Sequence, residues 1–160
     1  MNVSTIKISD LRDQPHFLEA VADRVWRAWW QERGESLETV AGLFAENLTT
    51  TEVLPACLVA HRGDDFVGTA SLIASDLEER PALTPWVAAV WIEPELRRRR
   101  HGAAIVAAAA ELAFSRGFAQ AYLCAESDKR AFYAGLRWRH LEKDVGPYGL
   151  DIFELRAPVG

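Results

Sequence analysis

Hydrophobic positions change their spacing several times along the chain, and each spacing predicts a different element. Residues 4–9 alternate in polarity and include β-branched side chains, which predicts a strand. After Pro15, which suits the first turn of a helix, apolar residues recur at every fourth position. That stripe consists of Phe17, Val21, Val25 and Trp29. We expect this helix to end at Gly34.

A second helix is predicted after Ser36, whose hydroxyl can cap it. Its expected buried face consists of Leu37, Val40, Phe44 and Leu48. Three tryptophans gather where the two helices meet, namely Trp26, Trp29 and Trp30. We interpret them as packing residues, and the alternative is that one of them lines a substrate cleft.

A hairpin and a buried strand are predicted in the middle of the chain. Residues 56–61 and 66–75 have strand composition, and the segment 62–65 between them, Arg-Gly-Asp-Asp, favours a tight turn. A polar loop with two prolines follows at 76–85. Residues 86–92 are apolar on both faces, as in a central strand.

A dense basic turn follows that strand and leads into an alanine-rich helix, expected from about Arg99 to Arg116. Gly117 is the expected stop, and residues 119–125 are the next predicted strand. Crossing from one strand to the next through a helix is a βαβ step. The strands at 86–92 and 119–125 should therefore be parallel.

The C-terminal part predicts a short helix and two strands. Ser127 or Asp128 is expected to cap the helix. The strands are expected at 138–144 and 150–156, around the turn at 146–149.

Composition narrows the class of protein. Apolar residues make up 49% of the chain and charged residues 26%, which indicates a globular protein, and we expect residues 1–160 to form one domain. The formal net charge of -5 argues against general binding to nucleic acid or membranes. Cys57 and Cys124 lack the spacing of a metal site, so we expect no metal and a reducing compartment. Without a signal-like or membrane-spanning stretch, we expect a cytoplasmic protein.

The order strand, basic turn, helix predicts a phosphate site, because the first N–H groups of a helix lack partners and attract anions. The arginine side chains add positive charge to those N–H groups. The residues of this predicted site are Arg97, Arg98, Arg99, Arg100, His101, Gly102 and Ala103. The alternative is that the arginines are a solvated surface run.

Two stretches resemble the GCN5-related N-acetyltransferase (GNAT) superfamily. Residues 94–102 are similar to its R/Q-x-x-G-x-G/A acetyl-CoA signature, and residues 131–138 look like its A-x-Y-x-x-L-G-F/W segment. The resemblance covers nearly the whole chain. It implies an α+β fold with a mixed, largely antiparallel sheet of about seven strands and about four helices, with one parallel βαβ step at the acetyl-CoA site.

The sequence departs from the family pattern at two glycines. Arg100 stands at the first glycine of the acetyl-CoA signature, and Arg137 at the glycine before the aromatic residue. Each replacement adds a Cβ, and at Arg100 this could restrict the turn or the approach of the pyrophosphate. The added charge at Arg100 offsets part of that effect.

The resemblance also implies a reaction: acetyl transfer from acetyl-CoA to a primary amine, by direct attack in a ternary complex. Val90, Trp91 and Ile92 would offer backbone groups to the pantetheine arm, and Tyr133 would be the general acid. A phenol with a pKa of about 10 can protonate a thiolate whose conjugate acid is near 8.5. Glu126, at the end of a predicted strand, is the first candidate for the general base. Its rivals are Asp76, Glu78, Glu79, Glu93 and a water chain to solvent.

The acceptor is left open between a small amine and a protein N-terminus, and a homodimer is left open as well. The acidic loop 76–80 weakly favours a cationic amine. The first alternative function is a non-catalytic acyl-CoA-binding module, which the departure at Arg100 favours. The second is nucleic-acid binding by the arginine run, against which the net charge argues.

Overall fold

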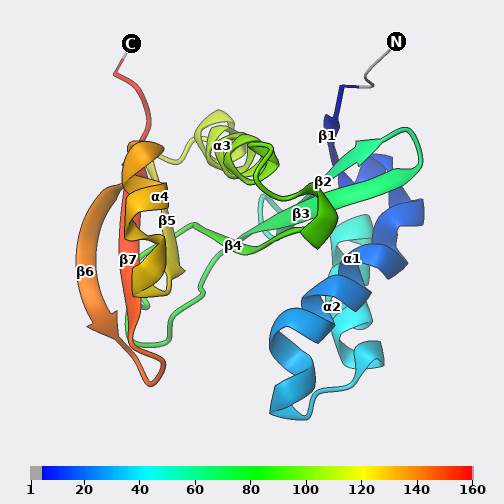
Figure 1. Cartoon of the computed structure of the whole chain (residues 1–160), viewed down its shortest axis with the longest axis horizontal. Helices are drawn as coiled ribbons and strands as arrows, with labels where there is room; N and C mark the ends of the chain where they lie inside the picture. The colour runs from blue at the N-terminus through cyan, green and yellow to red at the C-terminus, as the bar shows by residue number, and fades with distance from the viewer. Residues whose placement is uncertain (1–4, 160) are drawn as a thin grey trace.

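A seven-stranded mixed sheet runs through this computed structural model, which describes residues 5–159 (Figure 1). Its order is β1-β2-β3-β4-β5-β7-β6. Neighbouring strands are antiparallel except β4 and β5, which are parallel. The predicted largely antiparallel sheet with one parallel step is confirmed. The strands are β1 (Lys7–Asp10), β2 (Ala56–Arg62), β3 (Asp65–Ile73), β4 (Trp86–Ile92), β5 (Gln120–Ala125), β6 (Arg139–Val145) and β7 (Leu150–Arg156).

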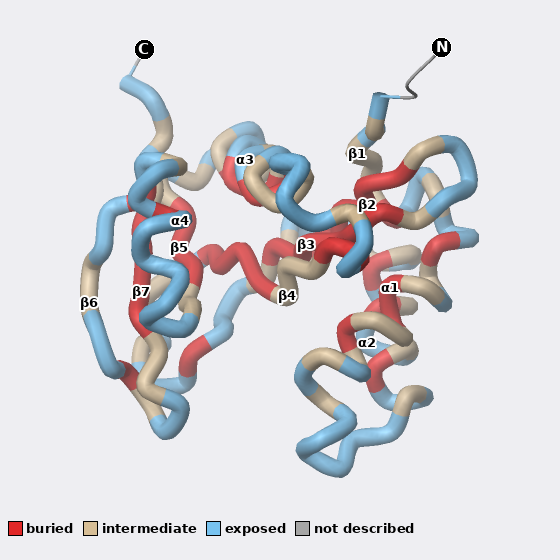
Figure 2. The backbone as a smooth tube through the Cα atoms, viewed as in Figure 1, coloured by how far each residue is buried: buried red, intermediate tan, exposed pale blue. Residues whose placement is uncertain are grey.

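Helices cover both faces of the sheet. On one face α3 (His101–Ser115) and α4 (Arg130–Gly135) pack against the strands. On the other face α1 (Leu18–Val25) and α2 (Leu37–Thr49) pack against β2. Buried positions concentrate in the central strands and on the inner sides of the helices (Figure 2). The buried side of α3 is mostly alanine, so the helix backbone lies close to the sheet.

The stripe predicted for the first helix is wrong at its last position. Trp29 is 37% exposed, whereas Trp26 and Trp30 pack against the core. The reason is a five-residue π-helical turn, Trp26–Trp30, that follows α1. A π turn inserts an extra residue, so the contact after Val25 falls at Trp30, five positions on. Gly34, at φ 80°, ends the helical segment as predicted.

Several predicted boundaries also shift. The first strand covers Lys7–Asp10 instead of residues 4–9, and Ser4 lies outside the described residues. The strand predicted at 66–75 is β3, which ends at Ile73, where the irregular loop begins. Neither Ser127 nor Asp128 caps α4: both lie inside a 3₁₀ turn, and no side chain caps the helix.

The strands β4 and β5 touch at one point only. Their single registered pair is Trp86 with Tyr122, after which the strands diverge. On its other edge β4 pairs with β3 through a bulge: the register shifts between Thr69 and Ser71, and Ala89 has φ 53°. The divergence leaves the β5-facing edge of β4 beyond Trp86 without a strand partner.

Gly68 allows β4 to pass close to β3 at the end of this bulged pairing. A Cβ on Gly68 would lie 2.4 Å from the Trp91 carbonyl oxygen. A side chain there would collide with backbone, so the position requires glycine. The close approach therefore helps to set the path of β4 toward the basic turn.

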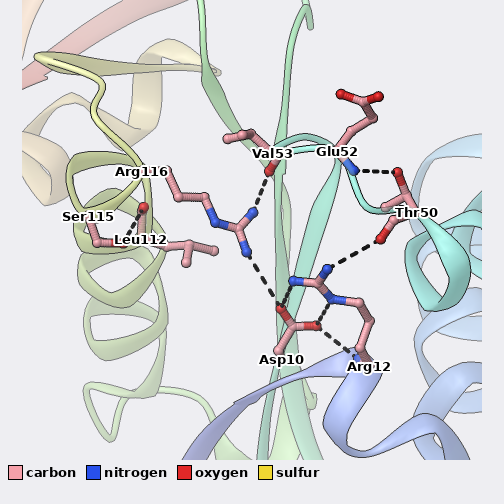
Figure 3. A network of polar contacts seen from close by, with 8 residues as sticks. All are labelled: Asp10, Arg12, Thr50, Glu52, Val53, Leu112, Ser115 and Arg116. Atoms are coloured by element: carbon pink, nitrogen blue, oxygen red, sulfur yellow. Dashed lines mark hydrogen bonds and ion pairs between the residues drawn. The ribbon is translucent and has the colours of Figure 1, made fainter.

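A polar network joins both helical layers at the far end of α3 (Figure 3). The Asp10 carboxylate accepts hydrogen bonds from the Arg12 backbone and side chain, at 2.9 Å for the backbone N–H. Arg12 also donates to the Thr50 carbonyl, 3.4 Å away at the end of α2. Arg116, at the C-terminus of α3, lies 3.9 Å from Asp10 and donates to the Val53 carbonyl. The C-terminal end of α3 is therefore held to β1 and to the segment after α2.

We expect Gly68→Ala to lower stability by about 1–3 kcal/mol, because the new methyl group overpacks against backbone. Thermal or urea unfolding measures the change. The matched control is Gly42→Ala in α2, where a Cβ would meet nothing within 4 Å. This control should raise stability by about 0.5–1 kcal/mol, as alanine is the better helix former. Equal effects of the two substitutions would contradict a close approach at Gly68.

Candidate functional site

The basic turn begins with an arginine that folds back onto the protein. A 3₁₀ turn, Pro94–Leu96, leads to Arg97. The Arg97 Nε donates to the Ile92 carbonyl at 2.8 Å, and its guanidinium lies 4.6 Å from the Trp91 ring centroid. This arginine therefore fixes the end of β4 against the turn. It also occupies the Ile92 carbonyl, one of the backbone groups predicted for the pantetheine arm.

The next three arginines are exposed, and the backbone of two of them is left-handed. Arg98 and Arg100 both have φ 66°, and Arg100 is the residue that precedes α3. Such alternation of backbone handedness turns successive N–H groups toward one side, which creates an anion-binding concavity. None of Arg98, Arg99 and Arg100 has an ion-pair partner within residues 5–159. Their charge remains available to a ligand.

His101 opens α3 with a nitrogen that lacks a partner. Its Nε2 is buried, and so is the unpartnered indole Nε1 of Trp91. Burial, followed by the charges of Arg62 and Arg99, lowers the pKa of His101. The lowered pKa favours the neutral form of the imidazole. A role of His101 in binding phosphate stays a prediction.

Tyr133 lies on α4, on the same face of the sheet as α3. Its ring is buried against Phe153 at 5.3 Å and Trp138 at 6.4 Å between centroids. Burial, followed by the neighbouring Cys124, raises the pKa of the phenol. Tyr133 therefore holds its proton at neutral pH, as a general acid requires.

Asp76 meets the opposite face of β5. Cys124 alternates with the core residue Leu123, so its thiol projects away from α4. The Cys124 thiol donates to the Asp76 carboxylate at 3.2 Å. Although the Asp76 residue as a whole is exposed, burial of its carboxylate raises its pKa, and the Cys124 hydrogen bond and the charge of Arg33 offset part of that rise.

The other carboxylates considered as the general base have positions that suit this role less well than that of Asp76. Glu93 is buried and paired with Arg24, whose Nε lies 2.5 Å from its carboxylate. Glu126 is exposed after β5, with no hydrogen bond or ion pair from its side chain within residues 5–159. Glu78 and Glu79 are exposed on the loop that also carries Asp76. Of these five, Asp76 alone contacts β5 through its carboxylate. The only feature of the sequence that pointed to Asp76 was its place in the polar loop at 76–85.

Two surface hollows lie away from this site. One, of about 400 Å³, is lined by residues of β6 and β7 and by Arg137. The other, of about 540 Å³, lies along β1 and contains His61. Both nitrogens of that histidine are engaged, with Ser9 Oγ and the Gly63 carbonyl each 2.8 Å away. Within residues 5–159, no cluster of three or more His, Cys, Asp or Glu residues could hold a metal ion. In the same part of the chain, no helix combines the length and apolarity needed to cross a membrane.

Comparison with known proteins decides the family. The model of the acetyltransferase (GNAT) family matches residues 17–136. The chain belongs to this family. The match includes the basic turn and all of α4, so the GNAT resemblance read from residues 94–102 and 131–138 is confirmed.

Solved structures show the same fold at low sequence identity. An acetyltransferase from Streptococcus agalactiae 2603 is 14% identical, with a TM-score of 0.69, and the alignment covers 97% of this chain and 100% of that one. An N-acetyltransferase from Staphylococcus aureus Mu50 is 12% identical, with a TM-score of 0.71 and coverage of 96% and 99%. Salmonella typhimurium yncA, solved with its cofactor acetyl-CoA, is 17% identical, with a TM-score of 0.69 and coverage of 99% and 96%. No curated protein matches the chain.

As a GNAT family member, the chain is an N-acetyltransferase that uses acetyl-CoA. Its residues fit that cofactor. The turn before α3 presents Arg98, Arg99 and Arg100, which have no ion-pair partner within residues 5–159, and the first N–H groups of a helix. Among the described residues, the β5-facing edge of β4 beyond Trp86 has no strand partner, which leaves backbone groups for an extended ligand. Tyr133, on α4, lies on the same face of the sheet as α3.

Both departures from the family's glycines occur at left-handed backbone, since Arg137 has φ 71° and Arg100 φ 66°. A residue with a Cβ costs about 1–3 kcal/mol in this region, so glycine should stabilise the ligand-free protein at either site. We expect Arg137→Gly to raise the free energy of unfolding and to leave coenzyme A binding unchanged.

Arg100→Gly should raise stability too, but it should weaken coenzyme A binding, because a charge-assisted hydrogen bond to phosphate contributes about 1–3 kcal/mol. The loss should shrink in high salt. Titration of both variants at two salt concentrations, together with thermal unfolding, measures these effects. Tighter binding by Arg100→Gly would show that the arginine is a steric obstacle.

Proposed function

We propose that Tyr133 and Asp76 act from opposite faces of β5 to transfer an acetyl group onto a primary amine by direct attack. The observation that carries this proposal is the hydrogen bond from Cys124 of β5 to Asp76, on the face opposite Tyr133 and near the point where β4 and β5 diverge. A proton donor and a carboxylate with a raised pKa then flank the opening in the sheet. This pairing of an acid and a base is what acyl transfer to an amine requires.

The chain's own backbone and arginines would hold the donor. N–H groups at the start of α3 and the side chains of Arg98, Arg99 and Arg100 bind the pyrophosphate. The free edge of β4, at Val90 and Trp91, pairs with the pantetheine arm. Because Ile92 already accepts from Arg97, its carbonyl is the least available of the three predicted groups. When bound, acetyl-CoA supplies a thioester carbonyl as the acyl donor.

The side chains would then move two protons. Asp76 accepts a proton from the amine, whose nitrogen bonds to the thioester carbon. The carbon–sulfur bond breaks, and Tyr133 donates its phenolic proton to the departing sulfur. We place Asp76 ahead of Glu126 as the base because the Asp76 carboxylate accepts a hydrogen bond from Cys124 of β5 and burial raises its pKa. Loss of the Asp76 proton to solvent and reprotonation of Tyr133 from solvent complete the cycle.

The acid and base positions favour an enzyme over the non-catalytic acyl-CoA-binding module, which needs neither group. A small amine and a protein N-terminus both remain acceptors within this proposal. A homodimer and a cytoplasmic location remain predictions from the sequence.

We expect wild-type protein to release free thiol from acetyl-CoA in the presence of a suitable amine, and Tyr133→Phe to lower turnover by about 10²–10⁴-fold. The affinity for coenzyme A should stay within about twofold, because the hydroxyl acts on the leaving sulfur and not on the phosphates. A thiol-release assay over a panel of amines and a coenzyme A titration measure both. A wild-type rate in Tyr133→Phe would make Tyr133 a packing residue, and a chain that neither binds coenzyme A nor releases thiol would remove the proposal.

The proposed base has its own signature in the pH–rate profile. The carboxylate must be ionised to accept a proton, so the rate should fall as pH falls through the raised pKa of Asp76. Asp76→Asn should lower the rate and abolish this acid limb. Cys124→Ala removes a hydrogen bond that lowers this pKa, so it should move the limb to higher pH. Glu126→Gln is the control and should leave the limb in place.

Measurements of stability distinguish a role of Asp76 as the base from a purely structural role. A carboxylate whose pKa is raised by folding gives stability at low pH that is lost as pH rises through the folded pKa. Asp76→Asn should therefore unfold at the same or a higher temperature than wild type at pH 7. A variant that is both inactive and unstable would show that Asp76 is structural.

A further inference from the structure

A positively charged side chain lies on the same side of the sheet as the proposed base. It belongs to Arg33, in the segment between α1 and α2, where Gly34 at φ 80° reverses the chain. The Trp26 indole donates to the Glu35 carbonyl at 2.7 Å, and the Glu35 N–H donates back to the Trp30 carbonyl at 3.2 Å. These bonds hold the segment in one conformation and set the direction of Arg33.

Two aromatic rings support the Arg33 guanidinium. Its Cζ lies 4.7 Å from the centroid of Tyr148 and 5.7 Å from that of Trp30. Stacking uses the face of the guanidinium and leaves the N–H groups at its edge free to bind an acceptor. Arg33 has no ion-pair partner within residues 5–159. An arginine that is positioned but not neutralised is suited to an anionic ligand.

The contacts around Tyr148 place Arg33 on the Asp76 side of the sheet. The turn between β6 and β7 that carries Tyr148 touches the β3–β4 loop, since a Cβ on Gly146 would lie 3.0 Å from a Glu79 carboxylate oxygen. Arg80 of that loop is also ion-paired with Glu142 of β6. The charge of Arg33 reaches Asp76 on the same loop and lowers its pKa. The two groups nevertheless do not form an ion pair.

We propose that Arg33 binds a carboxylate carried by the acceptor, so that this enzyme acetylates small amino acids at their amino group. The inference rests on the proposed function, because Asp76 must face the same acceptor. An amino acid brings an ammonium group to Asp76 and a carboxylate to Arg33. A simple amine leaves Arg33 unpaired, and the amide of an amino acid offers it only a neutral oxygen. A peptide places its carboxylate far from its terminal amine.

The test compares matched acceptors in the thiol-release assay, with acetyl-CoA saturating. The panel contains the standard amino acids, their carboxamides, their decarboxylated amines and the corresponding glycyl dipeptides. For wild type we expect kcat/KM to be at least about tenfold higher for the best amino acid than for its amide, its amine or its dipeptide. Arg33→Gln should lower kcat/KM for amino acids by about 10- to 100-fold and leave the amides unchanged. Arg33→Lys should restore part of the loss.

The control variant is Arg27→Gln, which removes an exposed arginine of the same helical segment that pairs with Asp23 at 3.0 Å. It should not change the preference for amino acids. Coenzyme A affinity should be the same in all variants, since Arg33 and its supporting rings, Trp30 and Tyr148, do not belong to the basic turn. A preference for amines without a carboxylate, or an equal loss on every acceptor in Arg33→Gln, overturns this inference but leaves acetyl transfer intact. Absence of thiol release with every amine, without coenzyme A binding, would instead remove the proposed function.

Discussion

The divergence of β4 from β5 is the constraint on which the rest of the site depends. Parallel strands normally pair along their length, yet here one pair, Trp86 with Tyr122, joins them. The bulge at Ala89 and the close passage at Gly68 turn β4 away toward the basic turn. The opening exposes backbone on one side to the donor, and it lets groups from both faces of the sheet approach the same point. Without it, the basic turn proposed to bind phosphate and Tyr133, the proposed acid, would serve no common ligand.

The chemistry of the site divides between those two faces. On the face covered by α3 and α4, the environment is positive at the turn and apolar around Tyr133, which suits phosphates and a neutral phenol. On the other face, Asp76 and Arg33 present opposite charges without neutralising each other. Helices α1 and α2 cover only the first strands of that face, so the β3–β4 loop and the β6–β7 turn complete it. In the proposed function, the acyl donor and the amine acceptor therefore contact surfaces that differ in charge and polarity.

Much of the fold could be predicted because its signals are local. The alanine-rich composition located α3, the continuous apolar run located β4, and the arginines located the basic turn. The position of Trp29 could not be predicted, since a π turn changes the helical repeat without a clear mark in the sequence. Asp76 could be named but not preferred, because its contact with Cys124 joins residues 48 positions apart. For the same reason, Arg33 could not be identified from the sequence: its supporting ring, Tyr148, comes from the other end of the chain.

The network around Asp10 has a mechanical consequence for α3. It anchors the helix at Arg116, while the opposite end, at the phosphate turn, is not tied in the same way. The helix has 15 residues and is therefore about 22 Å long. A rotation of one degree about the anchored end displaces the other end by about 0.4 Å. A small tilt about the anchor at Arg116 would therefore change the position of the basic turn, so the network around Asp10 helps to set where that turn lies.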